Sequence, residues 1–261
     1  MTPQEFKKRM QTLQEVILRA LTNYEVMKKL RYNDENDEDW TLDQQNNLLG
    51  RFKGFFSPVS LALTDMTFIQ FAKIFDPNKR TASFRILLDA ALEDASLLSH
   101  ISADEFAEVR QDVEDSKALV AKLKRLRDQQ LAHADANPLP VEPITLGDLD
   151  KLAESIKTNF NRLSSGHDKS IIGWDFALRT SEQDTTAVLR ALMESEERRT
   201  LGHEETMVRI GLDHLRRTEV TFGHTLGKET VREAIGTLGL TKEQMQRVEK
   251  EYQSRNQGAQ T

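Results

Sequence analysis

Apolar residues recur at intervals of three or four positions through most of the first 165 residues of this chain. The first set is Phe6, Met10, Leu13, Val16, Ile17, Ala20, Tyr24 and Met27. This spacing gathers side chains on one side of an α-helix, whereas a half-buried strand would alternate apolar and polar residues. Similar sets follow further along the chain, so the sequence predicts an all-α fold.

The predicted helix starts share a local signal. A Ser or Thr is followed three positions later by Glu, Gln or Asp at Thr2–Glu5, Thr41–Gln44, Ser102–Glu105 and Thr145–Asp148. In such a capping box, each side chain accepts a hydrogen bond from the backbone N–H of the other residue. A further helix is expected to begin at Ser57-Pro58 and to stop before Pro77, because proline suits the first turn of a helix and not its interior.

The chain divides by composition. The long helix that starts at Ser102 is predicted to end at His133, before a linker that holds Pro138, Pro140 and Pro143. Proline is absent beyond this linker, and the apolar periodicity weakens after about residue 165. We predict a helical bundle at 1–165 and a mostly helical C-terminal extension at 166–261, whose role the sequence does not assign.

Composition limits the class of protein. The chain has no cysteine, no apolar run near the roughly 20 residues of a membrane span and no apolar signal segment at its start. We therefore expect a cytoplasmic protein that does not bind a membrane. The net charge of −6 argues against a general nucleic-acid coating protein, but it leaves room for a local basic patch.

Arg127 and His133 are the candidate catalytic residues. With about 100° per helical residue, they flank the apolar stripe of Leu119, Leu123 and Leu126, about 120° apart. A guanidinium and an imidazole beside an apolar face need hydrogen-bond partners or a function. The alternative is that Arg127 is an ordinary cation at a helix C-terminus and that the ring of His133 has its hydrogen-bond partners within the fold.

Spacing alone does not single out this pair. Arg residues precede His by a similar interval at Arg162/His167, Arg198/His203, Arg209/His214 and Arg217/His224. Only the Arg127–His133 pair is predicted to lie on a long uninterrupted helix, with an acid, Asp128, directly after the arginine. Asp128 would orient Arg127 or His133, or would be an ordinary solvated residue.

A run of basic residues leads into this segment. Lys117, Lys122, Lys124 and Arg125 precede Arg127 without an intervening acid. One interpretation is an RNA-binding strip that contacts phosphates. The alternative is a solvated helix face whose charges suit the C-terminal end of the helix dipole.

Other chemistries find no support in the sequence. Gly223 to Thr230 has too few residues between its glycines for a phosphate-binding loop, and Glu229 stands where Ser or Thr is needed. No zinc-protease or di-iron motif occurs, so we predict no metal and no cofactor. A helix-turn-helix around Gly239 lacks the excess of basic residues that DNA binding requires.

The segment Lys124 to Asp135, with its Arg-Asp and Leu-Ala-His, resembles the Arg-x(4–6)-His motif of the HEPN superfamily. Ala72 to Asp76 and Thr81 to Leu88 look like the pair of segments that precedes this motif in the abortive-infection branch. The resemblance covers about residues 1–165. It implies a HEPN-like helical bundle that dimerises, and for many members a metal-independent endoribonuclease that acts as a toxin or phage-defence effector.

The residue types suit RNA cleavage by 2′-hydroxyl attack. His133 has the intrinsic pKa of a proton acceptor, and Arg127 can bind phosphate oxygens. The expected partners are RNA, a second copy of the chain and an antitoxin or sensor protein. The competing hypothesis is a non-catalytic HEPN-like module for binding or assembly. The stripe of Leu119, Leu123 and Leu126, polar at its end, predicts a two-fold interface built partly from residues 119–133.

Overall fold

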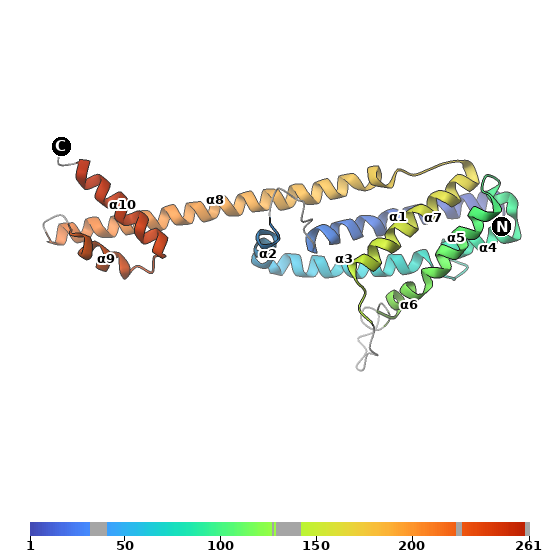
Figure 1. Ribbon diagram of the computed structural model, residues 1–261, viewed down its shortest axis with the longest axis horizontal. Helices are drawn as coiled ribbons and strands as arrows, with labels where there is room; N and C mark the ends of the chain where they lie inside the picture. Colours follow the sequence, from blue (N-terminus) through green and yellow to red (C-terminus); the bar gives the residue numbers. More distant parts are fainter. Residues whose placement is uncertain (32–40, 127, 129–141, 223–225, 259–261) are drawn as a thin grey trace. The chain divides into compact units, whose positions relative to one another are not determined.

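The computed structural model describes residues 1–31, 41–126, 128, 142–222 and 226–258, and every regular element among them is helical (Figure 1). This confirms the predicted all-α class. In chain order the helices are α1 (Pro3–Arg31), α2 (Leu42–Arg51), α3 (Lys53–Ile74), α4 (Phe84–Glu93), the 3₁₀ turn η1 (Ala95–Leu98), α5 (Ala103–Asp115), α6 (Lys117–Leu126), α7 (Leu146–Asp168), α8 (Trp174–Phe222), α9 (Lys228–Gly236) and α10 (Lys242–Gly258).

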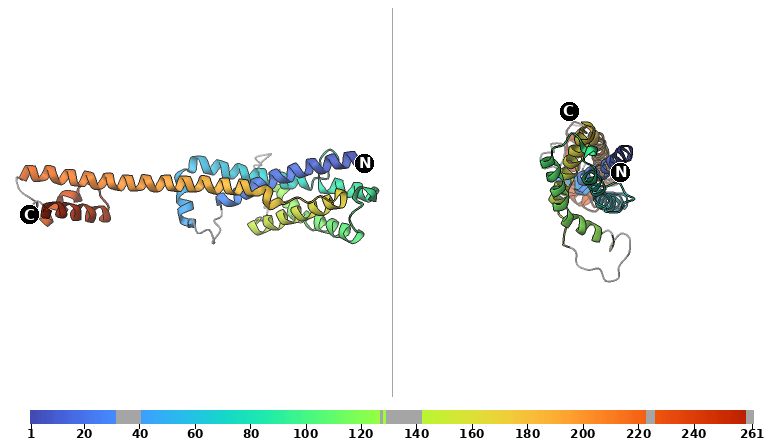
Figure 2. Two further views of the ribbon diagram at one scale, coloured as in Figure 1. Left: turned by 90° about the horizontal axis from the view of Figure 1, so that it is seen from above. Right: turned by 90° about the vertical axis from the view of Figure 1, so that its right-hand side faces the viewer.

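The first compact unit covers Met1–Leu189. Its central helix is α1, which packs against α3, α4 and α7, and Figures 1 and 2 show α1 and α3 side by side. The helix α3 also contacts α2 and α6, while α5 contacts α4, α6 and α7. The largest fully buried side chains of this core include Phe6, Leu13, Ile17, Tyr24, Phe71, Phe84, Leu123 and Phe160. No helix of the described residues is both long and apolar enough to cross a membrane.

The capping boxes form as predicted. Gln44 N–H donates to Thr41 Oγ1 at 3.2 Å, and Thr41 N–H donates to Gln44 Oε1 at 2.8 Å. The same reciprocal pair closes the starts of α5 and α7. Each box satisfies backbone N–H groups that have no partner within the helix.

The predicted start of α3 at Ser57-Pro58 is wrong. The helix begins at Lys53, so Pro58 lies inside it. Its first turn is held by Phe52, whose carbonyl accepts from the N–H groups of Phe55 and Phe56 at 2.9 and 3.0 Å. Phe56 is buried, and its packing favours the additional turn over the proline boundary.

The predicted uninterrupted helix from Ser102 to His133 is also wrong. The described part is two helices, α5 and α6, separated at Ser116. The Ser116 hydroxyl donates to the carbonyl of Asp112 at 2.9 Å, four residues earlier. A side-chain hydrogen bond of this kind competes with the helical pattern and often bends the chain.

The boundary between compact units lies further along than the composition change at residue 165. The second unit covers Arg190–Thr261. Trp174 and Leu178, at the start of α8, belong to the core of the first unit. The Trp174 ring lies 5.7 Å from the Phe160 ring, and its Nε1–H donates to the carbonyl of Lys157 at 3.2 Å. These contacts attach the beginning of α8 to α7.

The helix α8 extends through a segment where the sequence shows little apolar periodicity. Many of its residues between 194 and 206 are exposed, so no apolar face is required there. Ion pairs within the helix stabilise this stretch instead: Glu194 with Arg198 at 3.4 Å, and Glu196 with Arg199 at 2.8 Å.

The second unit has its own small core. Apolar side chains from the end of α8, from α9 and from α10 meet in it, namely Val208, Leu212, Leu215, Leu226, Val231, Ile235, Val248 and Tyr252. The Tyr252 hydroxyl accepts from Leu226 N–H at 3.0 Å and donates to the Glu219 carboxylate. Gly211 allows α10 to approach α8 closely, since a Cβ at this position would lie 2.8 Å from a Val248 methyl carbon.

One polar cluster joins α1 to α7 in the first unit. The Asp150 carboxylate accepts from the buried Tyr24 hydroxyl and from Lys28 Nζ, both at 2.8 Å. Burial alone would raise the pKa of Asp150, but the hydrogen bonds from Lys28 and Tyr24 outweigh it, so the pKa lies below its usual value. The ionised carboxylate therefore stabilises the folded state.

Gly211→Ala is expected to destabilise the second unit by about 1–3 kcal/mol, because the added methyl group overpacks the contact with Val248. Gly202→Ala is the matched control, since nothing lies within 4 Å of a Cβ there and alanine favours a helix. Urea denaturation followed by hydrogen exchange of α9 and α10 measures the difference. Equal stability of the two variants would refute the close approach.

Asp150→Asn is expected to lower stability at pH 7 by less than about 1 kcal/mol, because the pair with Lys28 is partly exposed. A lowered carboxyl pKa gives stability that is present above the unfolded-state pKa of about 3.9 and is lost as the pH falls through the folded-state pKa. Thermal melts should therefore differ at pH 7 and converge as the pH falls below the folded-state pKa of Asp150. A difference that stays constant over this range would contradict the assigned role.

Candidate functional site

The helix α6 is anchored to the core by its apolar side chains. Leu123 is 0% exposed and Val120 is buried, while Leu119 packs against the same core. These residues lie where α6 packs on α3. The predicted use of Leu123 in a subunit interface is therefore wrong, because its side chain is buried within its own chain, whereas a role of the half-buried Leu119 stays a prediction. Leu126 is half-buried.

The three candidate catalytic residues follow α6. Arg127 and His133 lie outside the residues that the structure describes, so their geometry stays a prediction. Asp128 is described, and its side chain is exposed. The segment that carries the motif thus begins directly after a helix whose last two turns are fixed by Val120 and Leu123.

Two lysines of the predicted RNA-binding strip are held by carboxylates. Lys117 Nζ lies 2.8 Å from Glu114 Oε1, and Lys122 pairs with Glu142. Hydrogen bonds from the two ammonium groups lower the pKa values of Glu114 and Glu142. These pairs are exposed to solvent, so they hold the lysines only weakly. Arg125 is exposed at the end of α6.

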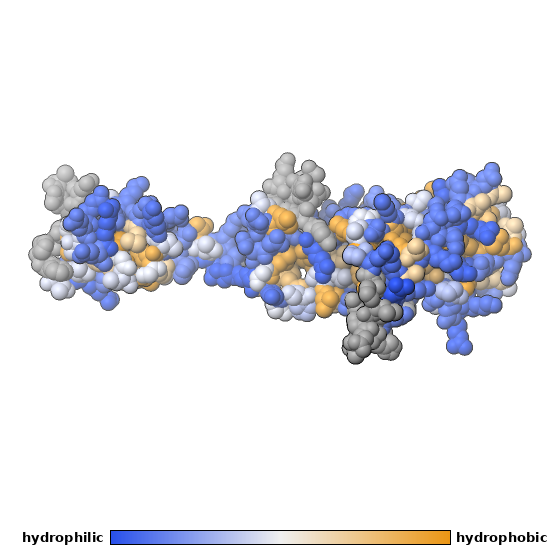
Figure 3. Space-filling view, turned by 60° about the horizontal axis from the view of Figure 1, so that its bottom comes forward, coloured by the Kyte–Doolittle hydropathy of each residue, from blue (hydrophilic) through white to orange (hydrophobic). Residues whose placement is uncertain are grey.

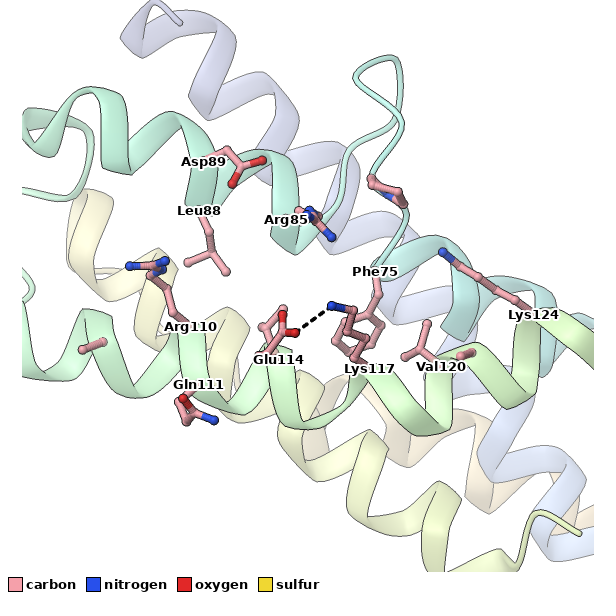
Figure 4. Close-up of a pocket in the computed structure, with 14 residues that line it drawn as sticks. Phe75, Arg85, Leu88, Asp89, Arg110, Gln111, Glu114, Lys117, Val120 and Lys124 are labelled. Carbon is pink, nitrogen blue, oxygen red and sulfur yellow. Dashed lines mark hydrogen bonds and ion pairs between the residues drawn. The ribbon is translucent and has the colours of Figure 1, made fainter. Parts of the chain in front are cut away.

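Lys124 instead lines a groove between α4, α5 and α6 (Figure 4). The groove has a volume of about 770 Å³. Arg85 of α4 and Arg110 of α5 also line it, together with Lys117. The sequence analysis missed both arginines. Helical spacing relates only residues of the same helix. Arg85 and Arg110 come from two other helices than Lys124, so spacing could not connect them with it.

The pair Arg162/His167 has a structural role. Arg162 lies 3.3 Å from Glu108 and 3.6 Å from Asp112, which ties α7 to α5. Nδ1 of His167 donates to the carbonyl of Leu97 at 2.8 Å, and its ring lies 5.1 Å from that of Phe6. The two side chains thus serve different contacts, and the pair forms no composite site.

Metal-ligating side chains do not gather in the part of the chain that the structure describes: no group of three or more His, Asp or Glu residues there could hold an ion. The chemical groups at the end of α6 are instead cations with one adjacent carboxylate, Asp128. Such a set suits contact with an anionic ligand.

A sequence model of the HEPN family described as AbiU2 matches residues 3–188. The chain belongs to this family. The match confirms the resemblance to the abortive-infection branch of the HEPN superfamily, and it extends past residue 165 to the end of the first compact unit. No curated protein and no solved structure matches the chain.

Family membership assigns the first unit as an abortive-infection-type HEPN module. The matched range includes α4, α5 and α6, the helices that form the groove, and the segment Arg127 to His133. The second unit lies outside the match.

Proposed function

We propose that this AbiU2-family protein is a metal-independent endoribonuclease of a phage-defence or toxin–antitoxin system, acting in the cytoplasm. One observation carries the proposal: the family match spans the helix that leads into Arg127, Asp128 and His133. The basic groove that ends at Lys124 gives additional support, because RNA affinity rests largely on phosphate contacts.

The proposed reaction uses the 2′-hydroxyl of the substrate. His133 accepts the 2′-hydroxyl proton while the 2′-oxygen attacks the adjacent phosphorus. The bond from phosphorus to the 5′-oxygen then breaks, leaving a 2′,3′-cyclic phosphate, and the partner's His133 donates a proton to the 5′-oxygen. Arg127 stabilises the charge that develops on the phosphate oxygens, and Asp128 orients Arg127 or His133. Lys117, Lys122, Lys124 and Arg125 contact the RNA backbone.

The proposal requires two copies, because the predicted angle between Arg127 and His133 on one helix is about 120°. A surface on α3 supports such a dimer. Phe55 and Met66 are 63% and 44% exposed, and Ala62 is exposed between them. Figure 3 shows apolar side chains at the surface over the region of α2 and α3.

These α3 residues have the spacing of a helix-pairing seam. Phe55, Val59, Ala62, Met66 and Ile69 alternate steps of four and three positions, and none is charged. The set is self-complementary about Ala62. In an antiparallel pair of α3 helices, Phe55 would meet the partner's Ile69 while the two small Ala62 side chains meet at the axis. A second copy of the chain therefore fits this surface.

The competing function is a non-catalytic HEPN module that binds or assembles, with an antitoxin or sensor protein as its partner. It shares the fold and the dimer surface, and it differs only in whether RNA is cleaved. Loss of folding in the Arg127→Ala and His133→Ala variants, without nuclease activity in the wild type, would favour this alternative.

Purified protein in EDTA is expected to cleave tRNA or total RNA, and His133→Ala should reduce the rate at least about 100-fold, because a general base contributes roughly 10²–10⁴-fold. His100→Ala is the matched control, since this histidine is exposed and its backbone N–H, which donates to Gly166, is retained. Equal cleavage by wild type and His133→Ala, both with wild-type melting curves, would refute the proposal.

Ala62→Glu is expected to convert the dimer into a folded monomer, because it places two carboxylates together at the axis of the proposed pair. Leu61→Glu is the matched control: Leu61 is an exposed neighbour on α3 that lies off the seam. Light scattering measures the mass of each variant. An unchanged mass for Ala62→Glu would exclude α3 as the interface.

A further inference from the structure

The groove between α4, α5 and α6 has a local excess of positive charge. Four cations line it, Arg85, Arg110, Lys117 and Lys124, against two acids, Asp89 and Glu114. The chain as a whole carries a net charge of −6, so this balance is opposite to that of the rest of the protein. A concave surface of one charge sign concentrates ligands of the opposite sign.

Three of these cations have no ion pair among the described residues. Glu114 is bound to Lys117, whereas Arg85, Arg110 and Lys124 take part in none of the salt bridges found there. Arg162 in the same unit does have acidic partners, Glu108 and Asp112. Arg85 contributes to the lowered pKa of Glu114, but neither groove arginine forms an ion pair in the described part of the chain, so both guanidinium groups have donors available to an external anion.

The floor of the groove is apolar. Phe75, Leu88 and Val120 line it, and all three are buried. Figure 4 shows Arg110 and Lys124 toward opposite ends of the groove, with Arg85 between them. Cations along the rim of an apolar floor suit a strand that carries repeated phosphates along with sugars and bases.

The size of the groove selects among nucleic acids. Its volume of about 770 Å³ is that of a pocket for one small molecule, roughly 300–1,000 Å³. One or two nucleotides of a single strand fit such a space, whereas a duplex does not. Lys124 precedes Arg127 by three residues in the sequence, so the end of the groove at Lys124 is the end nearest the predicted motif along the chain.

We propose that the groove binds the backbone of single-stranded RNA, with Arg85 and Arg110 as phosphate-binding residues next to the cleaved bond. The inference deepens the proposed ribonuclease function and rests on it for the identity of the strand. It adds two binding residues from outside the motif, and it gives the direction in which the substrate approaches.

The test measures binding and not cleavage. Full-length protein with His133→Ala is titrated against a fluorescein-labelled 12-nucleotide RNA at several salt concentrations, and anisotropy gives the Kd. Adding Arg85→Gln and Arg110→Gln should raise the Kd at least tenfold. The slope of log K against log salt should become shallower by about 1.4, because each phosphate contact with a single strand contributes about 0.7.

Arg19→Gln is the matched control, because Arg19 is exposed on α1 and does not line the groove. It should leave both the Kd and the slope unchanged. An unchanged slope in the double arginine variant, an equal loss in Arg19→Gln, or equally tight binding of an RNA duplex would each overturn the proposal. Melting curves check that all variants remain folded.

The design separates this inference from the proposed function. If the wild type cleaves no RNA but the groove variants lose RNA binding, the groove assignment stands and the nuclease proposal falls. If the wild type cleaves RNA in EDTA but the groove variants bind it normally, the nuclease proposal stands and the groove assignment falls.

Discussion

The packing of α6 on α3 is the contact on which the site depends. Val120 and Leu123 are buried in this contact, and Leu123 is completely inaccessible to solvent. Burying such side chains contributes about 1.5–3 kcal/mol each, which fixes the helix against the bundle. The helix α6 also forms one wall of the basic groove, and Asp128 follows it. Four of the other side chains of α6 are charged: Lys117, Lys122, Lys124 and Arg125.

Some charges of the first unit join helices, whereas others line the groove. Arg162 with Glu108 and Asp112, and Lys28 with Asp150, tie one helix to another. Arg85, Arg110 and Lys124 have no such ion pair among the described residues, and they face one groove. Clustered like charges repel one another, so the positive charges gathered in the groove do not stabilise the fold. The gathering of four cations in one groove therefore makes it a part of this AbiU2-family protein suited to an anionic ligand.

Local signals in the sequence predicted the parts of the fold that depend on neighbouring residues. The capping boxes at Thr41, Ser102 and Thr145 formed as expected, because each needs only four consecutive residues. The break at Ser116 was missed, because its hydroxyl competes with a helix that the apolar spacing alone favours. The boundary after Leu189 was missed for a different reason: Trp174 joins the first core by packing on Phe160, a contact between helices. Arg85 and Arg110 were missed for the same reason, because they lie on different helices and come together only in the folded chain.

The chemistry of the cut end tests the central claim most directly. Attack by the 2′-hydroxyl leaves a 2′,3′-cyclic phosphate, and it cannot occur where the nucleotide on the 5′ side of the cut is a 2′-deoxynucleotide. An RNA cleaved in EDTA and analysed by mass spectrometry is therefore expected to carry the cyclic phosphate, and a single 2′-deoxy substitution at the cut position is expected to block cleavage there. A product with a free 3′-hydroxyl, or undiminished cleavage of the substituted strand, would contradict this account.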